Sequence, residues 1–328
     1  MKKAISLAVV GATGLVGRTM LRVLEERETP IGDLSLFASP QSKGRTLSFR
    51  GKPHEIQSLE DGVLAADYAL FAVKNRLAAE WVPHFRKAGA VVIDNSSYFR
   101  MHKEVPLVVP EVNGNALEQH AGLIANPNCT AAIASVALAP LHRAFGLSRL
   151  IFSTYQSVSG TGQRALEELE KETADSGHRP AVYPRPIAFN LFPQIGDFNA
   201  AGLCVEEQKI TEELSKILDA PKLSVAVTTV RVPVRVGHSL AIFAEFEKDI
   251  SLAEAGQQLR RAPGLVVMKD QEYATPLECV GRDEVFVGRL RQVHGNPKAL
   301  LLWVVGDNLR KGAATNAVQI LEKLIEKS

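Results

Sequence analysis

The sequence predicts an α/β fold in two parts. In the first part, short apolar runs alternate with segments of helical spacing, which is typical of a parallel sheet covered by helices on both faces. After residue 145, runs rich in β-branched and aromatic residues follow one another with few helices between them. This pattern favours an α+β part with a largely antiparallel sheet. At 328 residues the chain suits two domains rather than one.

Each element follows from its local composition. In the first part we expect strands at Lys3–Val10, Leu34–Ala38, Tyr68–Val73, Gly89–Asn95 and Leu123–Ala125. Apolar residues at helical spacing predict helices at Arg18–Arg27, Leu77–Ala88 and Ala131–Phe145. In the second part we expect strands at Arg149–Gln156, Leu223–Val234, Ser239–Glu247, Glu284–Arg289 and Leu300–Val305. Its helices are expected at Arg164–Thr173, Glu206–Leu218 and Gly312–Glu326.

A glycine-rich turn follows the first expected strand. Gly11–Gly17 reads G-x-x-G-x-x-G, and helical spacing begins directly after it. In a βαβ unit such glycines allow a tight turn and let the backbone approach a pyrophosphate at the helix N-terminus. The position therefore predicts a dinucleotide-binding, Rossmann-type domain rather than a tight turn alone.

The loop after the second strand bears on the choice of dinucleotide. NAD-selective enzymes usually place Asp or Glu here to bind the ribose 2′-hydroxyl. Ser39–Arg45 contains no acid, but has two hydroxyls and two cations. This composition favours NADP, and the alternative is an ordinary solvated basic loop.

Cys129 is the candidate nucleophile. Asn128 before it is a good N-cap residue, and the apolar run that follows predicts a helix. Unpaired N–H groups and the dipole at a helix start favour a thiolate, which covalent catalysis on a carbonyl or acyl group requires. The alternative is a small buried cysteine in a core.

Charged and titratable residues further along the chain can complete such a site. His238 titrates near neutrality and can exchange protons with a cysteine or an intermediate. Arg231 and Arg235 are four apart, so a continuous strand would place both on one face, where a guanidinium can bind a carboxylate. Glu206 and Lys209 share a helix face. Each of these residues, taken alone, is also compatible with an ordinary structural role.

Composition excludes several other classes of function. The net charge of +2 gives no reason to expect nucleic acid or an anionic membrane as a partner. Three cysteines far apart argue against a disulfide framework and favour a reducing, cytoplasmic location. We find no metal-type Cys/His spacing, no signal peptide and no apolar run long enough to span a membrane.

Eight stretches together carry a family resemblance. They are GATGLVG (11–17), DNSSYFR (94–100), VPLVVPEVN (105–113), NPNCT (126–130), YQSVSGTG (155–162), EEQK (206–209), RVPVRVGHS (231–239) and GDNLRKGAATNAVQI (306–320). On these motifs the chain resembles the bacterial type of aspartate-semialdehyde dehydrogenase, in collinear order over essentially its whole length. The resemblance implies reversible, NADP-dependent conversion of aspartate semialdehyde and phosphate to aspartyl phosphate, in the biosynthesis of Lys, Thr and Met.

The resemblance also implies residue roles. Cys129 is the expected nucleophile that forms a thioester, His238 the general acid/base, and Gln156 and Asn128 position the substrate or stabilise the oxyanion. Arg231 is expected to bind the substrate carboxylate, Glu206 its ammonium group, and Arg100 with Lys209 the phosphate. The implied cofactor residues are Gly11, Thr13, Gly14, Leu15, Val16, Ser39, Gln41, Ser42, Ser159, Gly160 and Asn308.

The resemblance further implies an NADP-binding domain of residues 1–125 and 310–328, a catalytic, substrate-binding and dimerisation domain of residues 126–309, and a homodimer that can pair into a dimer of dimers. Two departures stand out. The family usually has arginine where this chain has Gln41, and Ala-Gly-Gly where this chain has Val73–Asn75. The alternatives are a reductase for another acyl phosphate or acyl thioester, and a non-catalytic paralogue.

Overall fold

The computed structural model describes residues 4–62, 65–175, 177–269 and 271–327. They form two compact units, one drawn from Met1–Asn128 and Ala313–Ser328, the other from Cys129–Gly312. Among the described residues, no helix is long and apolar enough to cross a membrane.

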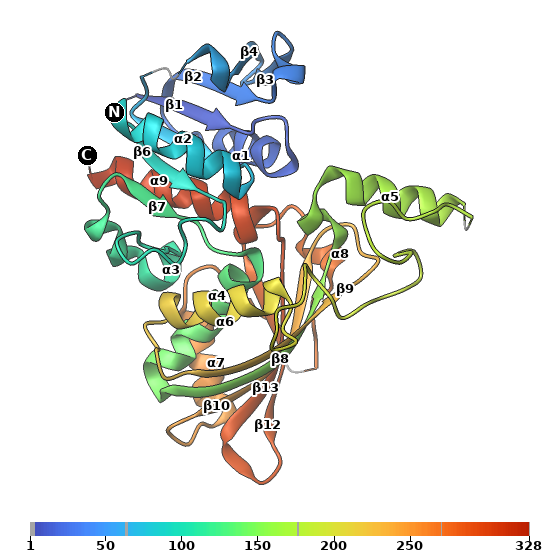
Figure 1. The fold of residues 1–328 in the computed structure, drawn as a ribbon. Coiled ribbons are helices and arrows are strands. Elements are labelled where there is room, and N and C mark those ends of the chain that lie inside the picture. The colour runs from blue at the N-terminus through green and yellow to red at the C-terminus, as the bar shows by residue number, and fades with distance from the viewer. Residues whose placement is uncertain (1–3, 63–64, 176, 270, 328) are drawn as a thin grey trace. The chain divides into compact units, whose positions relative to one another are not determined.

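The first unit is built on a parallel sheet (Figure 1). Its strand order is β3-β4-β2-β1-β5-β6-β7, with bounds β1 Ile5–Val10, β2 Ile31–Ala38, β3 Thr46–Phe49, β4 Lys52–Ser58, β5 Tyr68–Phe71, β6 Val91–Asp94 and β7 Leu123–Ala125. All neighbours pair in parallel except β3 and β4. The predicted parallel sheet is therefore confirmed, with the antiparallel β3–β4 hairpin as an addition that the apolar pattern did not reveal.

Helices cover both faces of this sheet. The helices are α1 (Leu15–Glu26), α2 (Asn75–Lys87), the short α3 (Pro110–Asn113) and α9 (Thr315–Lys327). Leu70 of β5 packs in a core with residues of α1 and α9. The next residue, Phe71, points the other way and meets Phe85 of α2 edge to face, with ring centroids 5.1 Å apart. Successive side chains of one strand thus pack into two cores, one on each face of the sheet, as a sheet buried on both faces requires.

The second unit has a mixed, mainly antiparallel sheet in the order β11-β12-β13-β10-β8-β9 (Figure 1). Its strands are β8 Leu147–Gln156, β9 Ser224–Arg231, β10 His238–Phe246, β11 Leu265–Val267, β12 Val285–Val293 and β13 Asn296–Gly306. The β8–β9 and β11–β12 pairs are parallel and the other three antiparallel. The helices are α4 Cys129–Phe145, α5 Gln163–Ala174, α6 Val205–Ile217, α7 Leu252–Arg261 and α8 Pro276–Cys279.

One face of this second sheet is covered by α4, which contacts β8, β10, β12 and β13. Along β8 the residues alternate: Leu150, Phe152 and Gln156 are buried, whereas Ile151 is 48% exposed. The buried set is on the α4 side of the sheet, because an antiparallel sheet with one covered face hides every second side chain. Gln156 therefore shares its face of the sheet with the helix that begins at Cys129.

The strand register gathers several chain segments at one edge of this sheet. Gln156, the last residue of β8, pairs with Arg231, the last residue of β9. His238, the first residue of β10, pairs with Gly306, the last residue of β13. Because β10 is antiparallel to both β8 and β13, its start lies beside their ends. Residues that are 75 positions apart (Gln156 and Arg231) and 68 positions apart (His238 and Gly306) thus meet at one edge.

Candidate functional site

His238 is fully buried at this edge and is held through one ring nitrogen. The backbone N–H of Ser157 donates to Nδ1 at 3.1 Å, and Ser157 Oγ is also 3.1 Å away. Because Nδ1 accepts a backbone hydrogen bond, the proton of the neutral ring is on Nε2. Nε2 is buried and has no hydrogen-bond partner among the described residues.

The surroundings of His238 keep it neutral. Burial, and then the positive charge of Arg231, lower the pKa of His238 from 6.5 to about 3. A histidine with this pKa remains uncharged at physiological pH. It is available to donate a hydrogen bond from Nε2 to a group that enters the site.

Replacing His238 by glutamine is expected to weaken the dependence of stability on pH. The unfolded chain binds this proton near pH 6.5 and the folded protein only near pH 3. The contribution to stability is therefore fully present above pH 6.5 and is lost as pH falls, by about 1.4 kcal/mol per pH unit within that window. Urea unfolding at pH 7 and pH 5 should show that the wild type loses about 2 kcal/mol more than His238→Gln. Equal losses would contradict the neutral, buried histidine.

Arg231 provides a second buried polar atom without a partner. The side chain is 3% exposed, and its NH1 group donates to the carbonyl oxygens of Gln156 and Ser157. Its Nε is buried and finds no acceptor within the part of the chain that the structure describes. A buried N–H without an acceptor costs about 1–3 kcal/mol, so this edge of the guanidinium is suited to an anionic ligand.

Gly160 lies between these two groups. A Cβ on Gly160 would stand 3.3 Å from Arg231 NH1 and 3.5 Å from His238 Nε2. Gly160 itself is exposed. Arg231 NH1 and His238 Nε2 thus both lie close to the side of Gly160 that carries no side chain.

Cys129 is the first residue of α4, as predicted, and it is partly exposed although its neighbours Asn128 and Thr130 are buried. The segment after β13 passes over this helix start. A Cβ on Gly306 would come within 3.0 Å of Ile133, one turn beyond Cys129, and a Cβ on Gly312 within 2.8 Å of the Cys129 Cβ. Glycine at these two positions lets residues 306–312 lie against the first turns of the helix.

Asn308 ties this segment to the loops around His238. Its Oδ1 accepts from the Gly237 N–H at 2.8 Å and from the Ser157 hydroxyl at 3.0 Å, and its Nδ2 donates to the Ser159 hydroxyl at 2.9 Å. Both Asn308 and Ser159 are buried. Their role as cofactor ligands stays a prediction, and the structure adds a role in holding the His238 loops together.

One arginine prediction is wrong. β9 ends at Arg231, and the chain leaves the sheet before Arg235, so the two side chains do not share a strand face. Arg235 is exposed and pairs with Glu170 of α5. The expected strand Leu223–Val234 extends three residues beyond the end of β9, but Pro233 cannot donate a ladder hydrogen bond there.

Glu206 and Lys209 lie one turn apart near the start of α6. The neighbouring Glu207 joins this helix to β9: its carboxylate accepts from the Cys204 N–H at 2.9 Å and from the Thr229 N–H at 3.0 Å. Thr229 is two residues before Arg231. The start of α6 is thereby anchored close to the end of β9, which fits a shared role in substrate binding.

In the first unit the glycine-rich turn has the geometry of a dinucleotide loop. Gly11 has φ +88°, and a Cβ there would be 2.3 Å from the Ala72 carbonyl oxygen. A Cβ on Gly17 would be 2.2 Å from the Gly11 oxygen. α1 begins at Leu15 with no acid in its first turn. The loop around Thr13 and Gly14 therefore presents a helix N-terminus without a competing negative charge.

The other candidates of the first unit are arranged as follows. Ser39 and Gln41 are exposed, and Ser42 is half-buried, directly after β2. Lys43 forms an ion pair with Asp61 at 2.5 Å, so its charge is already partly neutralised. Arg100 is buried and donates to the carbonyl oxygens of Asn126 (2.9 Å) and Asn95 (2.7 Å). Arg100 thus links the segments that follow β6 and β7. Its predicted role in binding phosphate stays a prediction.

The unusual residues after β5 fit without strain. Lys74 has φ −71°, and Asn75 begins α2. The Asn75 amide donates to the Ser97 hydroxyl at 2.9 Å and accepts from the Ser97 N–H at 3.0 Å. Neither position has the positive φ that would favour glycine. Among the described residues, no group of three or more His, Cys, Asp or Glu side chains is arranged to hold a metal ion.

Comparison with known proteins identifies the family. A family model described as "Semialdehyde dehydrogenase, NAD binding domain" matches residues 6–120, and "Semialdehyde dehydrogenase, dimerisation domain" matches residues 138–311. An aspartate-semialdehyde dehydrogenase from Aquifex aeolicus is 46% identical over 98% of both chains. The chain belongs to the aspartate-semialdehyde dehydrogenase family.

Members of this family are oxidoreductases that act on an aldehyde. The crystal structure of aspartate-semialdehyde dehydrogenase II from Vibrio cholerae is 41% identical, with a TM-score of 0.97 and 99% coverage of both chains. The same enzyme was also solved in a complex with ASA. The Candida albicans enzyme with NADP shares the fold at 23% identity and a TM-score of 0.79.

Reasoning from sequence missed Ser157 and Gly312 in this aspartate-semialdehyde dehydrogenase fold. Ser157 directly follows Gln156 and fixes the His238 ring. Gly312 gives room for Cys129. A signal existed for both residues, because each lies inside a motif that carried the family resemblance, but their roles depend on contacts between distant segments.

Proposed function

We propose that the protein catalyses the reversible, phosphate-dependent interconversion of aspartate semialdehyde and aspartyl phosphate with NADP, in the biosynthesis of lysine, threonine and methionine. The observation that carries the proposal is that Arg231 and His238 meet beside Gly160, and that each has a buried nitrogen, Nε and Nε2 respectively, with no partner among the described residues. A small substrate with a carboxylate and a carbonyl oxygen would give each of them a partner. The Vibrio cholerae relative in complex with ASA supports this choice of substrate.

In the reductive direction, Cys129 would attack the acyl carbon of aspartyl phosphate. Phosphate leaves and a thioester forms on the sulfur. NADPH, when bound, supplies the hydride that reduces this thioester. His238 would donate a proton to the oxygen of the resulting thiohemiacetal and take one back in the reverse direction. Gln156 and the backbone at Asn128–Cys129 would stabilise the oxyanion.

Substrate binding would also prepare His238 for this role. After burial, the Arg231 charge is the second cause of the low pKa of His238. A substrate carboxylate on Arg231 offsets that charge, so the pKa of His238 is expected to rise in the complex. The ring can then carry the second proton that it transfers.

Each charged group of aspartyl phosphate would have an oppositely charged partner among the candidate residues. Arg231 would bind the α-carboxylate, Glu206 the ammonium group, and Arg100 with Lys209 the phosphate. A reductase of another acyl phosphate or acyl thioester would have no use for the combination of Arg231 and Glu206. That alternative, and a non-catalytic paralogue, are outcomes of the test below.

The test is phosphate-dependent reduction of NADP and of NAD by the purified protein with aspartate semialdehyde. Turnover that requires phosphate is the expected result. Folded protein that shows no turnover with either cofactor would overturn the proposal and favour the alternative of a non-catalytic paralogue. Turnover with a different aldehyde and none with aspartate semialdehyde would point to a reductase for another acyl group.

Replacing Ser39 by aspartate is expected to change the cofactor that the enzyme prefers. We propose that Ser39, Gln41 and Ser42 receive the 2′-phosphate of NADP. A carboxylate at the exposed position 39 would repel that phosphate and accept a hydrogen bond from a free ribose hydroxyl. We expect kcat/KM for NADP to fall about 100-fold and that for NAD to rise.

Lys43→Gln is the matched control for Ser39→Asp, because Lys43 is already paired with Asp61. We expect it to change kcat/KM for NADP by less than about threefold. An unchanged NADP to NAD ratio in Ser39→Asp would show that this loop does not bind the 2′-phosphate.

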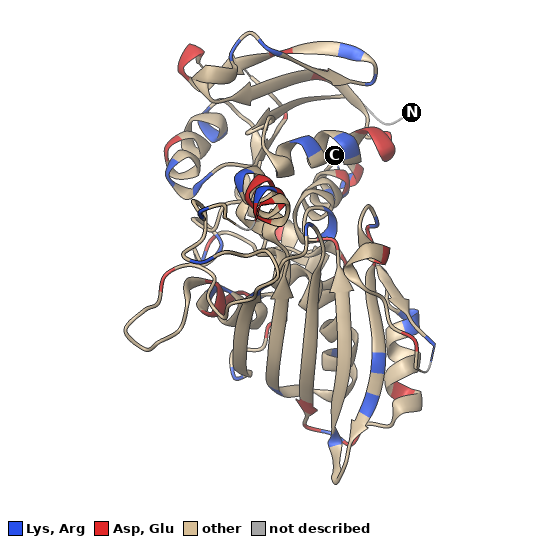
Figure 2. Ribbon diagram, turned by 90° about the vertical axis from the view of Figure 1, so that its right-hand side faces the viewer, with Lys and Arg blue, Asp and Glu red and all other residues tan. Residues whose placement is uncertain are grey.

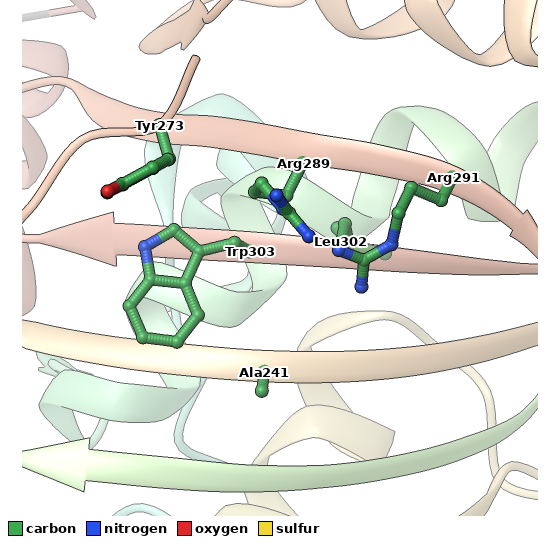
Figure 3. A pocket seen from close by; sticks show the side chains of 6 residues that line it. All are labelled: Ala241, Tyr273, Arg289, Arg291, Leu302 and Trp303. Carbon is green, nitrogen blue, oxygen red and sulfur yellow. The ribbon is translucent and has the colours of Figure 1, made fainter. Parts of the chain in front are cut away.

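We further propose that the protein is a homodimer through the face of the second sheet that α4 does not cover. Most of each strand is free of charged residues (Figure 2). The face exposes Ile151, and it carries a pocket of about 270 Å³ in which Trp303 and Tyr273 lie beside Arg289 (Figure 3). An apolar sheet face of this kind is suited to a partner, and the family model for these residues is named for dimerisation. None of the three cysteines forms a disulfide within the described part of the chain, which is in keeping with a reducing, cytoplasmic compartment.

A further inference from the structure

We propose that Tyr183 is a positioning residue for Arg231, and that two buried glutamates of α5 hold it in place. The inference rests on the proposed function, because it concerns how the arginine would bind the substrate carboxylate. Neither Tyr183 nor these glutamates belong to the residues predicted above for catalysis or binding.

Tyr183 covers the guanidinium group of Arg231. The Arg231 Cζ lies 5.9 Å from the centre of the Tyr183 ring. A cation over an aromatic face is attracted by the ring quadrupole. The guanidinium is also bound through NH1 to the carbonyl oxygens of Gln156 and Ser157. Arg231 is therefore held both by the ring and by these hydrogen bonds, while its Nε has no partner among the described residues.

The segment that carries Tyr183 also holds the backbone of Arg231. The Phe192 N–H donates to the Arg231 carbonyl oxygen at 3.2 Å, and the Arg231 N–H donates to the Phe192 oxygen at 2.9 Å. The Phe192 ring meets the Tyr183 ring edge to face at 5.5 Å. The Tyr183 hydroxyl donates to Thr161 Oγ1 at 2.9 Å, in the turn that contains Gly160. Tyr183 thus joins the arginine to the turn beside which a substrate would bind.

Two buried carboxylates fix the backbone of this segment. Glu168 accepts from the N–H groups of Ala181 (2.6 Å), Val182 (2.7 Å) and Tyr183 (3.1 Å). Glu172, one turn later on α5, accepts from Ile187 at 2.6 Å and Ala188 at 2.8 Å. The two glutamates are only 3% and 4% exposed.

A buried carboxylate is costly unless hydrogen bonds compensate for lost hydration. Here backbone N–H groups of the Tyr183 segment donate to both oxygens of Glu168 and to one oxygen of Glu172. The other Glu172 oxygen has no partner among the described residues. The loop and α5 consequently order each other, and the position of the Tyr183 ring depends on both. A loop held only by its own turns would not restrain the ring in this way.

The consequence for the reaction is selectivity for the carboxylate. A guanidinium that cannot rotate presents its Nε edge in one orientation, which favours an α-carboxylate in one geometry. Loss of the ring should weaken binding of a substrate that has this carboxylate. It should matter little for an otherwise similar aldehyde that lacks the carboxylate.

The experiment compares aspartate semialdehyde with 3-aminopropanal, which lacks the carboxylate, in the wild type and in Tyr183→Leu and Tyr183→Phe. For Tyr183→Leu we expect KM for aspartate semialdehyde to rise about tenfold, while kcat changes less than about threefold. The preference for aspartate semialdehyde over 3-aminopropanal should fall by a similar factor. Tyr183→Phe keeps the ring and is expected to retain most of the preference.

The outcomes separate the possible explanations. Equal losses for both aldehydes in Tyr183→Leu, or no loss for either, would overturn the positioning role. Phe189→Leu, at a side chain of the same segment that is 87% exposed, serves as a control for loss of an aromatic ring and should leave the preference unchanged. A wild-type enzyme that does not prefer aspartate semialdehyde would overturn the proposed function itself, and the inference with it.

Discussion

The Cys129→Ser variant is expected to lose at least about 10⁴-fold in kcat for phosphate-dependent reduction of NADP. Serine keeps the shape of the side chain at the start of α4, so the packing against Gly312 is preserved. Its hydroxyl, however, stays protonated where a thiol at a helix N-terminus is readily ionised. The thioester that the proposed mechanism requires cannot form on oxygen.

Cys279→Ser is the matched control for this variant. Cys279 is buried, and burial together with the charge of Asp307 raises the pKa of its thiol to about 12. Its Sγ donates to the Pro276 carbonyl oxygen at 3.3 Å, a hydrogen bond that a serine hydroxyl can also make. This variant should keep nearly full activity. It should also keep the labelling of the native protein by iodoacetamide, which is expected at Cys129.

The Cys129 assignment would be contradicted if Cys129→Ser kept a tenth or more of the activity. An equal loss in Cys129→Ser and Cys279→Ser, with a lowered melting temperature in both, would indicate damage to folding rather than to chemistry. A circular dichroism melt of each variant distinguishes these cases.

Local signals in the sequence predicted the parts of the site that depend on neighbours along the chain. The glycine spacing after the first strand predicted a turn in which Gly17 packs against the Gly11 carbonyl oxygen and has no room for a side chain. The apolar run after Cys129 predicted the helix that begins there. In both cases the physical requirement and the residues that meet it lie within about ten positions.

Contacts between distant segments were not predictable in this way. The strand register that places Arg231 beside Gln156, and His238 beside Gly306, follows from the pairing of four strands. The β3–β4 hairpin was missed because its strands are largely polar, although Arg50 and Gly51 at the turn both have positive φ. The prediction that Arg231 and Arg235 share a strand face was wrong because a strand end cannot be located from apolar residues alone.

Arg231 and Arg235 differ in burial, so their lysine variants are expected to differ strongly in activity. Arg231→Lys is expected to lower kcat/KM for aspartate semialdehyde about 10³-fold, or about 4 kcal/mol. Lysine keeps the positive charge but has no Nε–H and no planar fork. It therefore loses the bonds to the Gln156 and Ser157 carbonyl oxygens, and with them the buried Nε–H that has no acceptor among the described residues.

Arg235→Lys makes the same chemical change four residues later, on an exposed side chain that pairs with Glu170. An exposed ion pair contributes at most about 1 kcal/mol, and lysine can replace arginine in it. We expect kcat/KM to change less than about twofold. Steady-state kinetics of the two variants side by side thus measure the effect of burial and geometry at constant charge. Little loss in either variant would mean that positive charge alone, through long-range attraction of the anionic substrate, suffices and that a fixed guanidinium at the end of β9 is not required.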